Sequence, residues 1–232
     1  MPRKNVDISS RIDSVVSNFG QLPLAGTPLG KTSELTASPE IILAMAMDAM
    51  VKSRPISHDL AQRTTNRLIE QGYHHIDVLS KSTWEERTDV LREGGYNRYR
   101  EQCSTNLGSL ADLVTDKYDG DLNHLLQAAN GDREDARALM KEVKGVGDLG
   151  VELFFNNVQS VWPDIAPFLD SRSLNTAAEI EIGQDLDAIY GALGRDPKEM
   201  SVFANGLSTV RLEKKHLANR GIDTDLRKSS QL

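Results

Sequence analysis

Residues 141–155 have the sequence Lys141-Glu-Val-Lys-Gly-Val-Gly-Asp-Leu-Gly-Val-Glu-Leu-Phe-Phe155, which predicts two helices joined by a tight turn. The turn is centred on Gly145-Val146-Gly147, and we expect glycines there because its backbone angles would be resisted by a Cβ atom. Such a turn would also direct the N-terminal amides of the second helix toward an anion such as a DNA phosphate. A plain corner between two helices gives the same pattern, so both interpretations stay open.

An apolar, proline-containing loop follows the second of these helices. Residues 162–172 have the sequence Trp162-Pro-Asp-Ile-Ala-Pro-Phe-Leu-Asp-Ser-Arg172, which places Asp170 at the start of the next predicted helix. This aspartate can be the N-cap of the helix that begins near Ser171. It can also be a functional carboxylate at the end of the loop, and the two roles are compatible.

The rest of the chain is also predicted to be helical. Ser38-Pro39 is a capped helix start, and Cys103, Leu107 and Leu110 begin the apolar stripe of a long amphipathic helix. Helices are predicted over 39–52, 57–70, 83–93, 103–114, 121–129, 132–143, 151–158, 186–193 and 200–210, with a short one near 8–18. No segment alternates like a strand. We therefore predict an all-α protein with an N-terminal arm over 1–37, one domain over 38–214 and a polar C-terminal tail over 215–232.

The pairing of a Gly-x-Gly hairpin with an apolar loop and an aspartate resembles the helix-hairpin-helix (HhH-GPD) superfamily of DNA glycosylases, the endonuclease III relatives. The resemblance covers roughly residues 39–185, and the helices over 39–52 and 57–70 occur in that family's order. It implies a two-lobed helical bundle that binds double-stranded DNA with one base flipped out of the stack. It also implies a monomeric enzyme of base-excision repair that hydrolyses the N-glycosidic bond of a damaged or modified base.

The resemblance assigns a catalytic role to one residue. In that family the aspartate stabilises the oxocarbenium-like charge as the glycosidic bond breaks, or activates the attacking water, and Asp170 matches its position. Members that also cleave the abasic site carry a lysine two residues after the second glycine of the hairpin. Here that residue is Leu149, so the resemblance implies a monofunctional, water-using enzyme.

The DNA contacts that the resemblance implies fall at the hairpin and in two loops. They are Lys144, Gly145, Val146 and Gly147 at the hairpin, and Lys52, Arg54, Tyr96 and Asn97 in the loops. For the loop residues, a solvated loop or a helix cap is the alternative interpretation. Trp84 and Trp162 are predicted to be packing residues.

The sequence also limits the cofactors and the location of the protein. Its single cysteine, Cys103, excludes an iron–sulfur cluster and an internal disulfide, and the five histidines lack the spacing of metal ligands. We expect no metal or other cofactor, while the hairpin leaves room for a monovalent cation. Because no window approaches 18 consecutive apolar residues and residues 1–4 lead into polar sequence, we expect an intracellular protein of the nucleus, nucleoid or cytoplasm with no membrane partner.

The charge distribution is the main objection to a DNA-binding function. The net charge is −7, with four Lys/Arg and two acids in residues 1–31 and six Lys/Arg and three acids in residues 211–232, so the middle of the chain is strongly acidic. DNA-binding proteins usually present a basic face, because neutralising phosphates supplies much of their affinity. The acidic middle keeps two alternatives open: a glycosylase-fold protein without activity, and a helical protein-interaction module. The glycosylase hypothesis requires a local basic cleft, and no motif names the base that would be removed.

Overall fold

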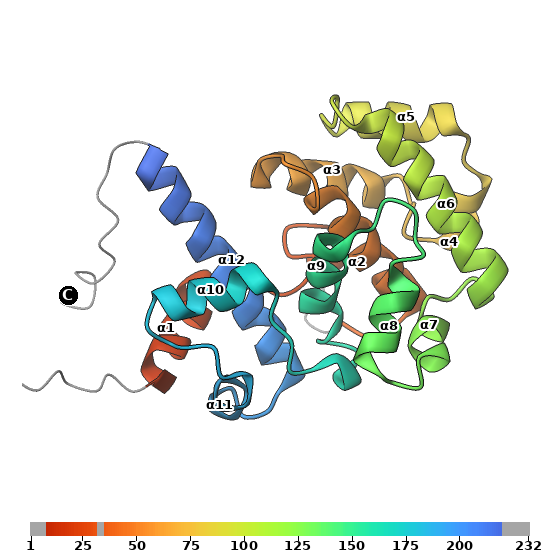
Figure 1. The fold of residues 1–232 in the computed structure, drawn as a ribbon. Coiled ribbons are helices and arrows are strands. Elements are labelled where there is room, and N and C mark those ends of the chain that lie inside the picture. Colours follow the sequence, from red (N-terminus) through yellow and green to blue (C-terminus); the bar gives the residue numbers. More distant parts are fainter. Residues whose placement is uncertain (1–7, 32–34, 220–232) are drawn as a thin grey trace, which may run out of the picture.

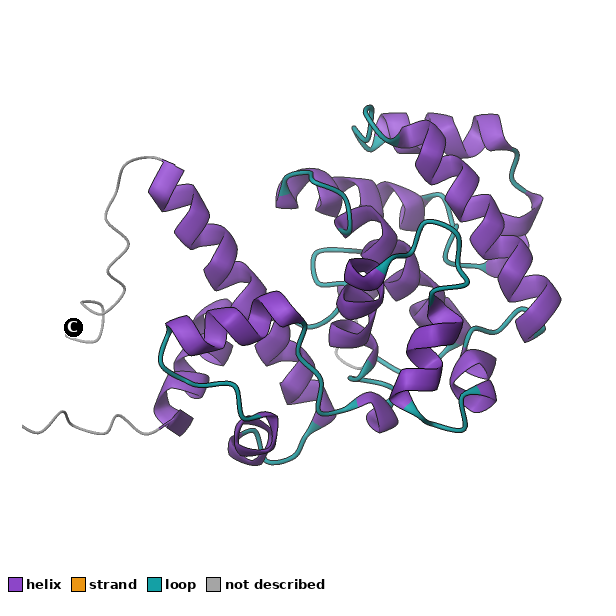
Figure 2. Cartoon of the chain, viewed as in Figure 1, coloured by secondary structure: helices purple, strands orange, loops and turns teal. Residues whose placement is uncertain are grey.

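The computed structural model describes residues 8–31 and 35–219, with side chains as far as Lys214, and within these ranges the chain is helical with no strand (Figure 2). The prediction of an all-α protein is therefore confirmed. The α-helices are α1 (Ile8–Phe19), α2 (Pro39–Lys52), α3 (His58–Glu70), α4 (Ile76–Lys81), α5 (Trp84–Glu93), α6 (Arg100–Tyr118), α7 (Asn123–Ala128), α8 (Arg133–Met140), α9 (Asp148–Val158), α10 (Ser171–Glu179), α11 (Leu186–Ala192) and α12 (Pro197–Asn219). None of the described helices has the length and apolarity needed to cross a membrane.

The helix starts follow from short polar side chains that satisfy free backbone amides. The Ser38 hydroxyl accepts a hydrogen bond from the Ile41 amide at 3.4 Å, and Pro39 occupies the first turn of α2. Thr83 and Glu86 form a reciprocal capping box at the start of α5. These caps are at the positions that the sequence predicts, whereas α4 has no counterpart among the predicted helices.

The core consists of two hydrophobic clusters, and Figure 1 shows the helices that contribute to them. The first surrounds α2, in which every side chain from Ile41 to Val51 is buried. The second is formed by α1, α10, α11 and α12 together with Leu169. Phe168 belongs to the first cluster, so the chain passes from one cluster to the other one residue before Asp170. The predicted arm contains α1, whose Ile12 and Val15 are buried in the second cluster.

Helix α9 connects the two clusters, because it packs on α2 and also on α12. The loop that follows α9 is held by buried polar side chains. The Gln159 amide donates to the carbonyl of Phe168 at 3.0 Å and accepts from its amide at 3.0 Å. The Arg133 guanidinium donates to the carbonyl of Pro167 at 2.7 Å. These contacts fix the position of Asp170 between the clusters.

Candidate functional site

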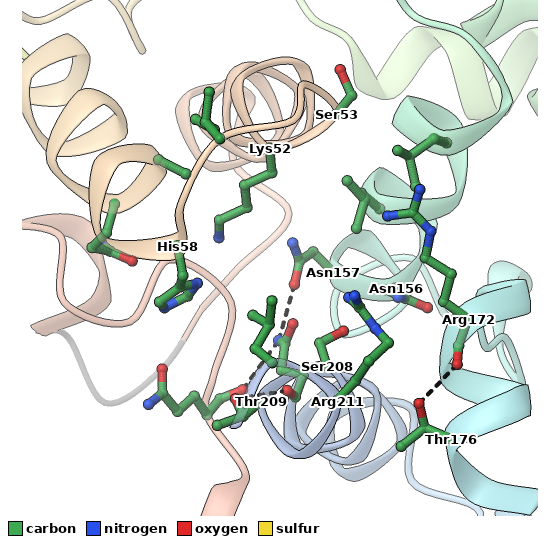
Figure 3. Close-up of a pocket in the computed structure, with 18 of the residues that line it drawn as sticks. Lys52, Ser53, His58, Asn156, Asn157, Arg172, Thr176, Ser208, Thr209 and Arg211 are labelled. Atoms are coloured by element: carbon green, nitrogen blue, oxygen red, sulfur yellow. Dashed lines mark hydrogen bonds between the residues drawn. The ribbon is translucent and has the colours of Figure 1, made fainter. Parts of the chain in front are cut away.

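A cleft of about 850 Å³ lies between the two hydrophobic clusters (Figure 3). Its walls are the loop between α2 and α3, one face of α9, and the facing sides of α10 and α12, with residues 21–25 at one edge. The two halves of the core thus leave between them a concave site of the size that commonly holds a small molecule or a nucleotide.

The lining of the cleft is strongly basic although the chain is acidic. Among the described residues that line it, Glu179 is the only carboxylate and His58 is the only aromatic side chain. Five Lys and Arg side chains line it: Lys52, Arg54, Arg172, Arg211 and Lys214. The local basic cleft that a DNA-binding function requires is therefore present in the fold, although the net charge of the sequence is −7.

The two lysines of the cleft are held by ion pairs. The Lys52 ammonium lies 2.7 Å from a carboxylate oxygen of Asp48, which is 2 % exposed and also accepts a hydrogen bond from the Thr65 hydroxyl at 3.0 Å. Lys214 lies 3.5 Å from Glu179. A buried carboxylate in the otherwise apolar helix α2 is costly unless it is paired. Asp48 thus fixes the ammonium of Lys52 at the edge of the cleft.

The three arginines of the cleft have no such partners. Within the described residues, no ion pair and no side-chain hydrogen bond is formed by the guanidinium groups of Arg54, Arg172 and Arg211. The Nε atom of Arg211 is also buried from solvent. Burial lowers the pKa of Arg211, and the nearby Asp170 carboxylate acts in the opposite direction. A buried donor without an acceptor is unfavourable in the free protein, so a ligand with acceptor oxygens would complete this site.

Asp170 lies beside the cleft, behind Asn156, and is 2 % exposed. One carboxylate oxygen accepts from the amides of Arg172 and Ser173, at 2.9 and 3.1 Å, as expected of an N-cap. The other oxygen accepts from the Asn156 amide at 2.6 Å and from the Ser173 hydroxyl. The N-cap interpretation of Asp170 is therefore confirmed, and four donors from the protein occupy its two carboxylate oxygens. Of the residues that donate to Asp170, Asn156 and Arg172 line the cleft.

Of the two hairpin glycines, Gly145 occupies a position that requires glycine and Gly147 does not. Gly145 has a φ of +86°, and a Cβ atom there would lie 1.9 Å from Nδ2 of Asn106, so this position requires glycine. Gly147 has a φ of −95° and open space around its Cβ position, so the expectation that a side chain would strain the turn there is wrong. Val146 is buried and packs against Gly150 instead of facing solvent.

The N-terminus of α9 is occupied by a charged pair. Asp148 lies in the first turn, where its carboxylate accepts a hydrogen bond from the Lys141 ammonium at 2.7 Å. That hydrogen bond holds the pKa of Asp148 below its usual value. Lys144 is exposed on the turn but does not line the cleft. The hairpin turn and the cleft are thus separate surfaces. Helix α9 begins at the hairpin, and its residues Leu149 and Leu153 line the cleft.

The other predicted contact residues fall into two groups. Lys52 and Arg54 both line the cleft. Tyr96 is 1 % exposed, and its hydroxyl donates to the carbonyl of Val51 at 3.2 Å, so it belongs to the core and is not available for a DNA contact. Asn97 is exposed, but it lies outside the cleft. Trp162 is buried as predicted, whereas Trp84 is 39 % exposed and the expectation that it packs in the core is wrong.

Sequence reasoning missed Arg172, Arg211 and Asn157, which line the cleft from α10, α12 and α9. For Arg172, the sequence signal was its position two residues after Asp170. The residues on α12 are far from the hairpin in sequence, and no motif marks them. The described residues contain no group of three or more His, Cys, Asp or Glu side chains that could hold a metal ion.

A scan of protein-family models finds none that matches this chain, and a search of curated proteins finds no match either.

Proposed function

We propose that the cleft binds double-stranded DNA with one nucleotide turned out of the helix, and that the protein is a monofunctional DNA glycosylase of base-excision repair. In this proposal it hydrolyses the N-glycosidic bond of a damaged or modified base. The observation that carries the proposal is the concentration of cationic side chains in the cleft of an acidic protein, three of them arginines without a partner among the described residues. Such guanidinium groups match phosphate oxygens in charge and geometry.

The dimensions of the cleft also support this proposal. Its volume of about 850 Å³ is adequate for a nucleotide. Its apolar side is formed by Leu149 and Leu153 of α9, which can pack on the face of a base. An extruded nucleotide would place its base in the cleft and leave the flanking phosphates at the rim.

The chemistry would rest on Asp170. A fixed anion behind the cleft wall would stabilise the positive charge that develops on the deoxyribose as the base departs. Water supplies the hydroxyl group that replaces the base at C1′, and its other proton neutralises the released base. The products are a free base and an abasic site. Leu149 occupies the position of the lysine of strand-cleaving relatives, so the proposal includes no covalent intermediate.

The experiment is base release from short duplexes that each carry one lesion: uracil, hypoxanthine, a methylated purine, an oxidised pyrimidine or 8-oxoguanine. Strand scission is measured with and without alkali for the wild type and Asp170→Asn, which keeps the size of the side chain and an N-capping oxygen. We expect scission only after alkali, and loss of it in Asp170→Asn with DNA binding retained. Full base release by Asp170→Asn would refute the catalytic assignment. Scission without alkali would refute the monofunctional assignment and direct attention to the amine of Lys52 in the cleft.

A second candidate function, DNA binding without base release, is favoured by one specific observation. All four hydrogen bonds to Asp170 come from within the protein, so the carboxylate is already committed to the fold. Salt-sensitive binding of every duplex, with no base released from any of them, would select this candidate. No salt-sensitive binding at all would leave a helical protein-interaction module.

A further inference from the structure

The cleft presents hydrogen-bond donors that the protein itself does not satisfy. Asn157 is 6 % exposed; its side-chain oxygen accepts a hydrogen bond from Asn205 at 3.0 Å, while its Nδ2 atom donates to no acceptor among the described residues. Nε of Arg211, which also lines the cleft, is buried without an acceptor (Figure 3). Buried donors are nearly always satisfied in native structures. Nε of Arg211 is such a buried donor, and Nδ2 of Asn157 is a second donor in the same cleft without an acceptor among the described residues, so the two point to a ligand that supplies acceptor atoms to both.

The cleft is also poorly suited to a positively charged base. Proteins bind organic cations by stacking them on aromatic faces, and no Phe, Tyr or Trp side chain is among the described residues that line this cleft. Five Lys and Arg side chains with one opposing carboxylate would repel a cationic ring instead. The Asp170 carboxylate lies behind Asn156 and already accepts four hydrogen bonds from the protein, and the Glu179 carboxylate in the lining is paired with Lys214.

We infer that the cleft selects neutral bases that carry carbonyl oxygens, and discriminates against cationic alkylated purines. Arg211 and Asn157 donate hydrogen bonds to the carbonyl oxygens, and the leucines of α9 pack on the ring. Uracil, hypoxanthine and oxidised pyrimidines belong to the selected class, whereas 7-methylguanine carries a positive ring and belongs to the rejected class. This inference rests on the proposed function and names the substrate class of the same site.

The test is equilibrium binding to duplexes that contain one 2′-fluoro nucleotide, which resists base release, so that recognition is measured apart from catalysis. The lesions are uracil, hypoxanthine and 7-methylguanine, with an undamaged duplex as reference. We expect the wild type to bind the uracil or hypoxanthine duplex about tenfold more tightly than the 7-methylguanine duplex. Arg211→Met should reduce this ratio to about twofold or less, because it removes one of the positive charges that repel the cationic ring. Arg211→Lys should keep most of the ratio, since lysine keeps the charge, but should weaken binding of all the duplexes because it lacks the planar fork that donates to the carbonyl oxygen.

The matched control is Arg92→Met. Arg92 is an exposed arginine on α5 that is paired with Asp89 outside the cleft, and its removal changes the net charge by the same amount. It should leave the ratio unchanged. Equal binding of the 7-methylguanine duplex, or an Arg211→Met variant that weakens all duplexes by the same factor, would overturn this inference alone. No salt-sensitive binding to any duplex would overturn the proposed function, and this inference with it.

Discussion

Asp170 lies beside the cleft at the N-cap of α10 and Arg211 lines the cleft from α12, and the two residues differ in the hydrogen bonds that they form with the rest of the protein. The Asp170 carboxylate receives four hydrogen bonds from its own chain. The Arg211 guanidinium donates none to the described residues, and its Nε is buried. The two groups are close enough for the carboxylate to affect the pKa of the arginine, yet no hydrogen bond joins them.

This difference indicates that Asp170 contributes mainly to the stability of the fold, whereas the Arg211 guanidinium is available to bind a ligand. A buried group with all its bonds made contributes to stability, and its removal should destabilise the protein whatever the protein binds. A buried group with bonds unmade contributes little to stability and is available to a ligand. Substitutions at the two residues should therefore affect different measurements, and the following predictions test that separation.

The largest effect on stability is expected from Asp170→Ala. It removes the N-cap of α10 and leaves the buried Asn156 and Ser173 groups without their acceptor, at a combined cost of about 3–4 kcal/mol in the free energy of unfolding. The measurement is urea denaturation followed by circular dichroism. The matched control is Asp185→Ala at the N-cap of α11, where the exposed carboxylate accepts from the Ala188 amide at 3.1 Å. That variant should lose only about 1 kcal/mol. Equal losses in the two variants would contradict the structural role assigned to Asp170.

A smaller loss is expected at the hairpin. Gly145→Ala places a Cβ against Asn106 and forces a left-handed backbone on alanine, which should destabilise the protein by about 2–3 kcal/mol. Gly147→Ala introduces no contact and no strained angle, and should change the stability by less than about 0.5 kcal/mol. Thermal or urea unfolding of the pair measures the contrast. If Gly147→Ala weakens DNA binding while stability is unchanged, the turn itself approaches the DNA.

The smallest effect on the free energy of unfolding is expected for Arg172→Gln, which should instead change the salt dependence of DNA binding. Because this side chain is exposed and unpaired, the free energy of unfolding should change by less than about 0.5 kcal/mol. The slope of log K against log salt concentration for duplex binding should fall in magnitude by about one, as for the loss of one phosphate contact. The comparison variant is Arg92→Gln, which should retain the wild-type slope. A slope that does not change in Arg172→Gln would remove this arginine from the interface.

The local helix signals could be predicted from the sequence, and the assembly of the cleft could not. Ser38, Ser57 and Thr83 cap the helices that they were expected to cap, because an N-cap depends only on the next three residues. Helix α4 was missed because it is six residues long and has no side-chain cap. Trp84 was expected in the core because of its residue type, although its indole nitrogen bonds to the Thr105 hydroxyl at an exposed position.

The same limit applies to the site. Lys52 and Arg54 were predicted as contacts because the family resemblance implies a DNA-contacting loop there. Arg211 lies more than 150 residues later and reaches the same cleft only because α12 packs on α9. Burial also removes a residue from the predicted DNA contacts. Tyr96 is a polar aromatic residue in sequence but a buried residue in the fold, where burial raises the pKa of its phenol. The acidic composition misled for a related reason, since net charge does not report which charges face one cleft.

The most direct test of the central claim is the salt dependence of duplex binding for a variant in which Arg54, Arg172 and Arg211 are all replaced by glutamine. Fluorescence anisotropy would be recorded between about 50 and 200 mM NaCl, with a duplex that contains a stable abasic-site analogue. Circular dichroism would first establish that the variant is folded. If the cleft binds DNA through its unpaired arginines, the wild type binds with a steep salt dependence and the variant loses at least about two from the magnitude of the slope, for the phosphate contacts of Arg54 and Arg172. Binding with an unchanged slope, or no salt-sensitive binding by the wild type, would contradict the assignment of the cleft as a DNA-binding site.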